Sequence, residues 1–129
     1  MNSSVEDKSV ERLIKDTLID LGIRPNLKGF WYTLECVKIT MQSGLRCDIK
    51  TMTLYEAAGE KYGVTGIAAE RSIRLCVKRI YERGNWDAIT GILGSSNHVQ
   101  NGRITAGEFV WTLADYIDYI TTQEDDADD

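Results

Sequence analysis

The stretch KYGVTGIAAERSIRLCVKRIYER (Lys61–Arg83) decides the fold, because it indicates a helix end, a three-residue turn and a second, longer helix. Gly63 suits the left-handed position that ends a helix, and Thr65 suits the N-cap of the next one. This arrangement is typical of a helix-turn-helix, whose second helix enters the major groove of DNA. The stretch therefore predicts a helix-turn-helix over about residues 53–83, with a recognition helix over about residues 66–83.

The predicted recognition helix has two chemically different faces. One side carries apolar residues at helical spacing, a pattern that predicts burial in a core. These residues are Ala69, Ile73, Cys76, Val77 and Ile80. The opposite side carries Arg71, Arg74 and Lys78, flanked by Glu70 and Arg79. The quoted stretch has six basic and two acidic residues, although the whole chain has a formal charge of −5. Positive charge aligned along one helix favours contact with phosphates, the alternative being an ordinary solvated face.

Length and composition predict one folded domain. A chain of 129 residues with 43% hydrophobic residues can bury a core of its own. No apolar run approaches the roughly 18 residues that span a membrane, so we expect no membrane partner. The N-terminal residues have no apolar signal segment, and three cysteines without CxxC spacing favour reduced thiols in a cytoplasmic protein.

Acidic residues concentrate at the C-terminus. Residues 123–129, QEDDADD, hold five acids and no base, and the rest of the chain has fifteen residues of each sign. This composition predicts an acidic disordered tail after a single domain over residues 1–122. The tail is interpreted either as a solubilising end or as a segment that competes with DNA for the basic helix.

Periodic apolar residues and helix-end signals predict six helices and no strand, so the fold class is all-α. We expect helices over about residues 3–21, 27–42, 53–62, 66–83, 86–93 and 105–120. Three of them begin with pairs at capping-box spacing. These pairs are Ser3 with Glu6, Thr53 with Glu56, and Thr105 with Glu108. The pattern of residues 94–104 predicts a loop, or a short hairpin around Asn101 and Gly102.

No arrangement for catalysis, or for a resident metal or cofactor, stands out. His98 is the only histidine, and it stands in a polar loop without a nucleophile beside it. That loop lacks the GK[ST] ending of a phosphate-binding P-loop. Cys36, Cys47 and Cys76 show no metal-ligand spacing. We therefore expect no enzyme activity, no metal and no cofactor.

Three segments resemble a known family: LGIRPNLKGFWYTLECV (Leu21–Val37), YEAAGEKYGVTGIAAERSIRLCVKRIYERGN (Tyr55–Asn85) and TAGEFVWTLADYI (Thr105–Ile117). Their LG–P–KG spacing, ERxIR string and RGN ending are similar to the C-terminal DNA-binding domain of the master response regulator of sporulation initiation in endospore-forming Firmicutes. The resemblance covers most of residues 13–120. It implies a six-helix, winged-helix/HTH-like effector domain that regulates transcription in the cytoplasm, with double-stranded DNA as its partner.

The resemblance also implies roles for particular residues. The ERxIR positions fall on Glu70, Arg71, Ile73 and Arg74, and the expected base readers are Glu70 and Arg71. Arginine can bond guanine O6 and N7 in a fork, and glutamate can accept a hydrogen bond from cytosine N4. The expected contacts to phosphates and backbone are Thr65, Arg74, Lys78, Lys61 and Arg79.

The sequence departs from the family pattern at three positions of the recognition helix. Where the family has an arginine, a serine and a histidine, this chain has Ala68, Ile67 and Leu75. The missing arginine–guanine pair removes about 1–3 kcal/mol of base discrimination. We therefore expect either weak binding to the family's DNA box or binding to a different box. Ile67 can instead contact a thymine methyl group.

Two functions of different class follow. The first is a sequence-specific DNA-binding transcription regulator. One helix makes few base contacts, so we expect self-association on tandem half-sites, with RNA polymerase as a further candidate partner. The alternative is a DNA-binding-deficient protein–protein interaction module that keeps the fold, because Ile67, Ala68 and Leu75 would expose apolar surface.

The family's full-length regulator also carries an N-terminal receiver domain. About twelve residues precede the matching region here, which is too few for a receiver. We expect either an excised domain or a stand-alone protein without phosphorylation control.

Overall fold

Seven helices make up the described part of the chain. The structure is a computed structural model that describes the backbone of residues 3–45 and 50–127 and the side chains of residues 8–45 and 50–122. In chain order the helices are α1 (Ser3–Asp20), α2 (Lys28–Gln42), α3 (Thr51–Tyr62), α4 (Gly66–Arg83), α5 (Trp86–Leu93), α6 (Asn97–Gln100) and α7 (Ala106–Ala127). No strand occurs within these backbone ranges, and the all-α prediction is confirmed.

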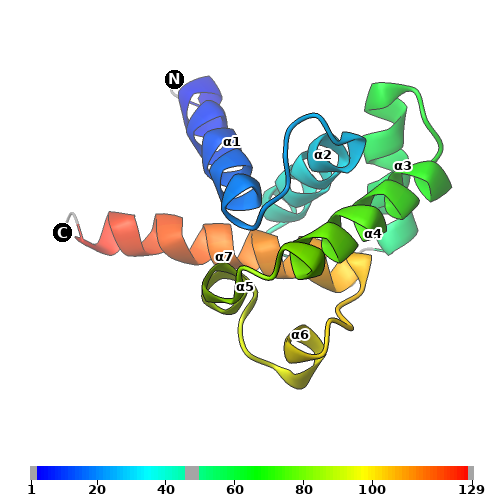
Figure 1. Ribbon diagram of the computed structural model, residues 1–129. Helices are drawn as coiled ribbons and strands as arrows, with labels where there is room; N and C mark the ends of the chain where they lie inside the picture. The colour runs from blue at the N-terminus through cyan, green and yellow to red at the C-terminus, as the bar shows by residue number, and fades with distance from the viewer. Residues whose placement is uncertain (1–2, 46–49, 128–129) are drawn as a thin grey trace.

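Helix α2 lies at the centre of the domain (Figure 1). It packs against α1, α3, α4 and α7, and α5 packs against α7. Large side chains from most of these helices are almost fully enclosed in one core, among them Phe30 and Phe109. The predicted apolar face of the recognition helix is confirmed, because all five of its residues are buried. These are Ala69, Ile73, Cys76, Val77 and Ile80.

Gly29 allows α2 and α4 to approach closely. A Cβ atom added at Gly29 would lie 2.4 Å from the carbonyl oxygen of Ser72 and 2.5 Å from Sγ of Cys76. Both distances are far shorter than the roughly 3.5 Å of a favourable non-bonded contact. The position of α4 on the core therefore depends on the absence of a side chain at residue 29.

A short helix, α6, occupies part of the segment for which a loop or hairpin was predicted. Ser96 Oγ accepts a hydrogen bond from the Val99 amide at 3.3 Å and so caps this helix. The Asn101 amide donates to the Asn97 carbonyl at 3.0 Å. One turn is too short to show apolar periodicity, which is why the pattern did not predict it. The described helices number seven, and the predicted six is corrected accordingly.

The start of α3 differs from its predicted capping box. The helix begins at Thr51, and no side chain caps it. Thr53 lies inside the first turn rather than before it, so its hydroxyl does not precede the free N–H groups. The prediction that Thr53 and Glu56 form a capping box is therefore wrong. The side chains of Ser3 and Glu6 lie outside the described residues.

Helix α7 continues into the segment expected to be a disordered tail. It runs to Ala127, so the backbone of residues 123–127 is helical. Lengthening an existing helix adds one hydrogen bond per residue without a new nucleation cost, an effect that composition does not report. Residues 128 and 129 lie outside the described residues.

Replacing Gly29 with alanine is expected to lower the free energy of unfolding by about 1–3 kcal/mol, because the added methyl group overpacks the contact with α4. Gly91→Ala is the matched control, since nothing lies within 4 Å of a Cβ at Gly91 in α5. That change should stabilise the protein by about 0.5–1 kcal/mol. Urea unfolding followed by circular dichroism measures both. A Gly29→Ala variant as stable as the unchanged chain would contradict the close packing of α2 on α4.

Candidate nucleic-acid interface

The turn between α3 and α4 has the geometry of a helix-turn-helix. Gly63 adopts the left-handed conformation, with φ 73° and ψ 29°. The Val64 amide donates to the Gly59 carbonyl at 2.8 Å, which closes the end of α3. Thr65 Oγ1 accepts a hydrogen bond from the Ala68 amide at 3.1 Å and caps α4. Both helix-end signals predicted for this turn are confirmed.

Two further glycines hold the turn close to α3. A Cβ atom at Gly59 would lie 2.4 Å from the carbonyl oxygen of Val64. A Cβ atom at Gly66 would lie 2.8 Å from Cγ and 3.1 Å from the amide nitrogen of Glu56. The backbone of the turn thus packs directly on α3. This contact sets the angle at which α4 leaves the turn, and with it the side of α4 that faces outward.

The outward face of α4 carries two cations that form no ion pair with any described side chain. Arg71 and Lys78 are exposed, and neither pairs with an acidic group among the side chains that the structure describes. Ile67 is 61% exposed and Leu75 is 46% exposed. Helical spacing places these two apolar residues on the same face as the cations. The face therefore offers both charge and apolar surface to a partner.

Glu70 and Arg74 form a close ion pair on α4. Arg74 Nε lies 2.8 Å from Glu70 Oε2 and donates a hydrogen bond to Oε1 at 2.9 Å. The two residues are one turn apart, the spacing at which helix side chains meet. The carboxylate is the less exposed partner of the two. In the free protein Glu70 is therefore held by Arg74.

Tyr55 lies close to this pair and was not anticipated from the sequence. The tyrosine is buried, at 4% exposure. Burial, and to a smaller extent the charges of Cys36 and Glu70, raise its pKa to about 12, and Arg74 opposes them. The phenol is therefore neutral at physiological pH. A single tyrosine in a short helix gives little sequence signal, since it can face either way.

Lys61, an expected phosphate contact, has an intramolecular partner. Its Nζ lies 2.6 Å from Glu35 Oε1 and 5.8 Å from the centroid of the Tyr62 ring. Glu35 is a buried residue of α2, and Lys38 Nζ lies 3.6 Å from the same oxygen. Leaving a buried carboxylate without its partner is costly, so Lys61 first neutralises Glu35. Glu35 was not predicted from the sequence, although an acidic residue within an apolar stretch of α2 is a signal of such a buried pair.

Arg79 lies on the flank of α4 away from Glu70, as helical spacing requires. Its Nε is 3.9 Å from Glu82 Oε1, and both side chains are more than half exposed. An exposed pair of this kind contributes about 0–1 kcal/mol, so Arg79 remains available to another anion.

The structure thus gathers several of the predicted site residues on one surface. Glu70, Arg71, Arg74 and Lys78 lie along the accessible side of α4, with Thr65 at its N-terminus. Arg79 lies on a flank of α4 and Lys61 in the last turn of α3, and each stands near a carboxylate of its own. We call Arg71, Arg74 and Lys78 the basic face.

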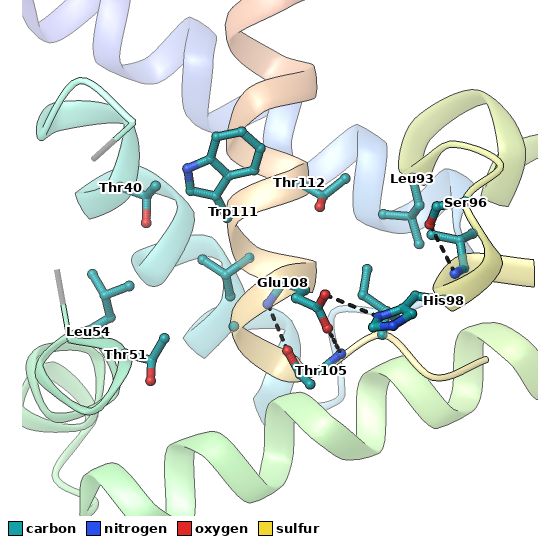
Figure 2. A pocket seen from close by; sticks show the side chains of 14 residues that line it. Thr40, Thr51, Leu54, Leu93, Ser96, His98, Thr105, Glu108, Trp111 and Thr112 are labelled. Atoms are coloured by element: carbon teal, nitrogen blue, oxygen red, sulfur yellow. Dashed lines mark hydrogen bonds and ion pairs between the residues drawn. The ribbon is translucent and has the colours of Figure 1, made fainter. Parts of the chain in front are cut away.

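A cavity of about 500 Å³ is lined by residues of α2, α3, α5, α6 and α7 and their loops (Figure 2). At its edge the Glu108 amide donates to Thr105 Oγ1 at 3.1 Å, and the Thr105 amide donates to Glu108 Oε1 at 2.9 Å. This confirms the capping box predicted for the last helix. His98 Nδ1 lies 3.4 Å from Glu108 Oε2. The hydrogen bonds from Thr105, and then the neighbouring His98, lower the pKa of the Glu108 carboxyl.

Where the structure describes their side chains, the cysteines and acidic residues show neither a metal site nor an activated thiol. No group of three or more His, Cys, Asp or Glu side chains in the described ranges is arranged to hold a metal ion. Cys36 and Cys76 are buried, and burial raises the pKa of their thiols to about 12 and about 11. Cys47 lies outside the described residues. Of the helices described, none is long and apolar enough to cross a membrane.

A family comparison agrees with this geometry. Residues 14–117 match the family model of the sporulation initiation factor Spo0A C-terminal domain. The chain belongs to the Spo0A C-terminal domain family. The match includes the whole helix-turn-helix and confirms the resemblance inferred from the three sequence segments. The Spo0A C-terminal domain is a helical DNA-binding regulatory domain and not a catalytic one, so family membership and the outward basic face point the same way.

Removing the charge of Glu108 is expected to make the stability of this Spo0A-type domain less sensitive to acid. The folded state lowers the pKa of Glu108 below its usual 4.5. The ionised carboxylate therefore stabilises the fold above that value, and its contribution is lost as the pH falls through the folded-state pKa. Glu108→Gln should be less stable than the unchanged chain at neutral pH, and this difference should shrink in acid.

Urea unfolding at a series of pH values measures this difference. Ser96→Ala is the control, because it removes the hydroxyl that caps α6, makes no contribution to the pKa of Glu108, and should cost about 1 kcal/mol with little dependence on pH. If the loss of unfolding free energy caused by Glu108→Gln stayed constant from neutral to acid pH, the role of the ionised carboxylate would be contradicted.

Proposed function

We propose that this domain binds double-stranded DNA sequence-specifically and regulates transcription, with α4 in the major groove. The observation that carries the proposal is the basic face of α4, which a helix-turn-helix holds outward. The major groove admits an α-helix, and its bases show a distinct pattern of donors and acceptors. Membership of the Spo0A C-terminal domain family supports the same function.

Glu70 and Arg71 are the proposed base readers. Arg71 is exposed and unpaired among the described side chains, so it can donate two hydrogen bonds to guanine O6 and N7. Glu70 accepts from cytosine N4 once Arg74 turns from the carboxylate to a phosphate. Until then the pair with Arg74 keeps the Glu70 charge neutralised, which reduces its repulsion of the approaching DNA.

Thr65, Arg74, Lys78, Arg79 and Lys61 are the proposed contacts to the DNA backbone. Thr65 stands at the N-terminus of α4, where free N–H groups attract a phosphate. Lys78 is exposed without an ion pair among the described side chains, which makes it a direct phosphate contact. Lys61 has to share its charge between Glu35 and DNA, so its contribution is the smallest of the set.

We further propose the setting in which this binding operates. One recognition helix makes few base contacts, so two copies self-associate on tandem half-sites. RNA polymerase is the proposed partner in transcription, and the cytoplasm the proposed location. The proposed role of the domain is that of a response-regulator effector domain in sporulation control in Firmicutes.

The exposed apolar residues support one alternative, a protein–protein interaction module that has lost DNA binding. Ile67 and Leu75 stand on the accessible face of α4, where apolar surface suits a protein partner. The salt dependence of the binding affinity distinguishes the two functions. Binding to DNA through four phosphates gives a log–log salt slope of about −3.6, whereas an apolar interface changes little with salt.

Arg71→Ala is expected to cost about 1–3 kcal/mol of discrimination between a duplex with tandem boxes of the family type and a random duplex. Fluorescence anisotropy of labelled duplexes at about 50 and about 200 mM salt measures this loss together with the salt dependence. Arg12→Ala, which removes an exposed arginine of α1, is the control and should leave binding unchanged. Failure of the unchanged chain to bind any duplex would reject the function. Equal weakening on both duplexes would make Arg71 a backbone contact.

Glu70→Gln is expected to separate base reading from overall attraction. The change removes a negative charge and frees Arg74, so binding to a random duplex should tighten. Discrimination should fall by about 1–3 kcal/mol, because the acceptor for cytosine is weakened. The control is Glu82→Gln, which removes an exposed carboxylate from the same helix and should increase the affinity for both duplexes equally. A Glu70→Gln variant that kept full discrimination would remove Glu70 from the base readers.

A further inference from the structure

A second group of cations lies beside the C-terminal end of α4. Arg24 comes from the loop between α1 and α2, and Arg83 is the last residue of α4. Both line a cleft of about 250 Å³ together with Arg79, and both also line an adjoining hollow of about 470 Å³. Both are exposed, and neither pairs with an acidic group among the described side chains.

The loop that carries Arg24 is held by its own hydrogen bonds. The Leu27 amide donates to the Arg24 carbonyl at 3.1 Å, which closes a tight turn. Trp31 Nε1 donates to the Pro25 carbonyl at 2.7 Å and ties the loop to α2. The backbone of Arg24 therefore has a fixed position, so less ordering is needed when its guanidinium meets a ligand.

Arg83 reaches the same cleft because Gly22 leaves room for it. Gly22 has φ +100°, and a Cβ atom there would lie 3.2 Å from Cγ and 3.3 Å from Nε of Arg83. The stem of Arg83 thus lies against the loop backbone. The one carboxylate that lines the cleft, Glu82, stands 3.9 Å from Arg79. Two like charges held beside one cleft repel each other, and an anion between them relieves that repulsion.

We propose that Arg24 and Arg83 bind a phosphate of the DNA backbone, in a contact separate from the basic face. This inference rests on the proposed function and adds the α1–α2 loop to the interface. The N-terminal residues of a recognition helix contact base edges. At 1.5 Å per residue Arg83 is about 18 Å along α4 from Arg71, more than the roughly 12 Å width of the major groove. Arg83 therefore meets the sugar–phosphate strand, and its planar fork suits a phosphate.

The test is the double variant Arg24→Ala/Arg83→Ala in the full chain, measured by anisotropy over a salt series. Affinity for tandem-box and random duplexes should fall by the same factor, because phosphate contacts carry no direct base information. The magnitude of the log–log salt slope should fall by about 1, because one phosphate is no longer neutralised. Arg12→Ala, the matched loss of an exposed arginine from α1, should leave the slope unchanged.

A second double variant, Arg24→Gln/Arg83→Gln, keeps a side-chain stem against Gly22 at position 83 and guards against loss of folding. Circular dichroism checks that both variants are folded. If the alanine variant is unfolded, the salt slope of the glutamine variant becomes the test. An unchanged slope, with DNA still bound, would overturn this inference and leave the proposed function standing. Failure of the unchanged chain to bind DNA at about 50 mM salt would overturn both. A further outcome is that the variants lose self-association in the absence of DNA while the salt slope of DNA binding stays unchanged. The arginines would then bind an acidic protein segment, and this result would also overturn the inference.

Discussion

The structure depends on direct contact between α4 and its neighbours at positions where no side chain intervenes. Gly29 brings the backbone of α2 against Ser72 of α4, and Gly66, at the start of α4, lies against Glu56 of α3. These two contacts leave α4 little freedom to shift or rotate. Rotation matters because successive residues of a helix are about 100° apart, so a rotation of one residue would turn Arg71 toward the flank. Tight packing beneath α4 thus determines what it offers outside.

The paired acids explain how a chain with a net charge of −5 presents cationic surfaces. Glu35 is enclosed and held by Lys61 and Lys38, and Glu70 is held by Arg74. Arg71 and Lys78 have no such partner among the described side chains. The local arrangement of charges, rather than their sum, governs the attraction of a charged ligand. The five acidic residues of the C-terminal segment 123–129 account for the negative sum.

Local signals account for the parts of the fold and site that could be predicted from the sequence. The turn at Gly63 and Thr65 follows from residues that act on their own backbone, and the two faces of α4 follow from helical spacing. The pairing of Lys61 with Glu35 could not be predicted in this way, because the partners are 26 residues apart and meet only when α2 and α3 pack. The convergence of Arg24 and Arg83 likewise required the tertiary structure.

In the proposed function, the departures from the family pattern change how much base contacts and phosphate contacts each contribute to DNA binding. Ala68, Ile67 and Leu75 replace polar family positions, so fewer groups on α4 can hydrogen-bond to bases. Phosphate contacts can supply affinity but carry no direct sequence information. In the proposed function, discrimination then rests on Glu70 and Arg71, on a methyl contact from Ile67 and on the spacing between two copies. Because Glu70 is paired with Arg74 in the free protein, the proposed base reading and phosphate binding are coupled. When Arg74 moves to a phosphate, it releases the carboxylate that we propose reads the base.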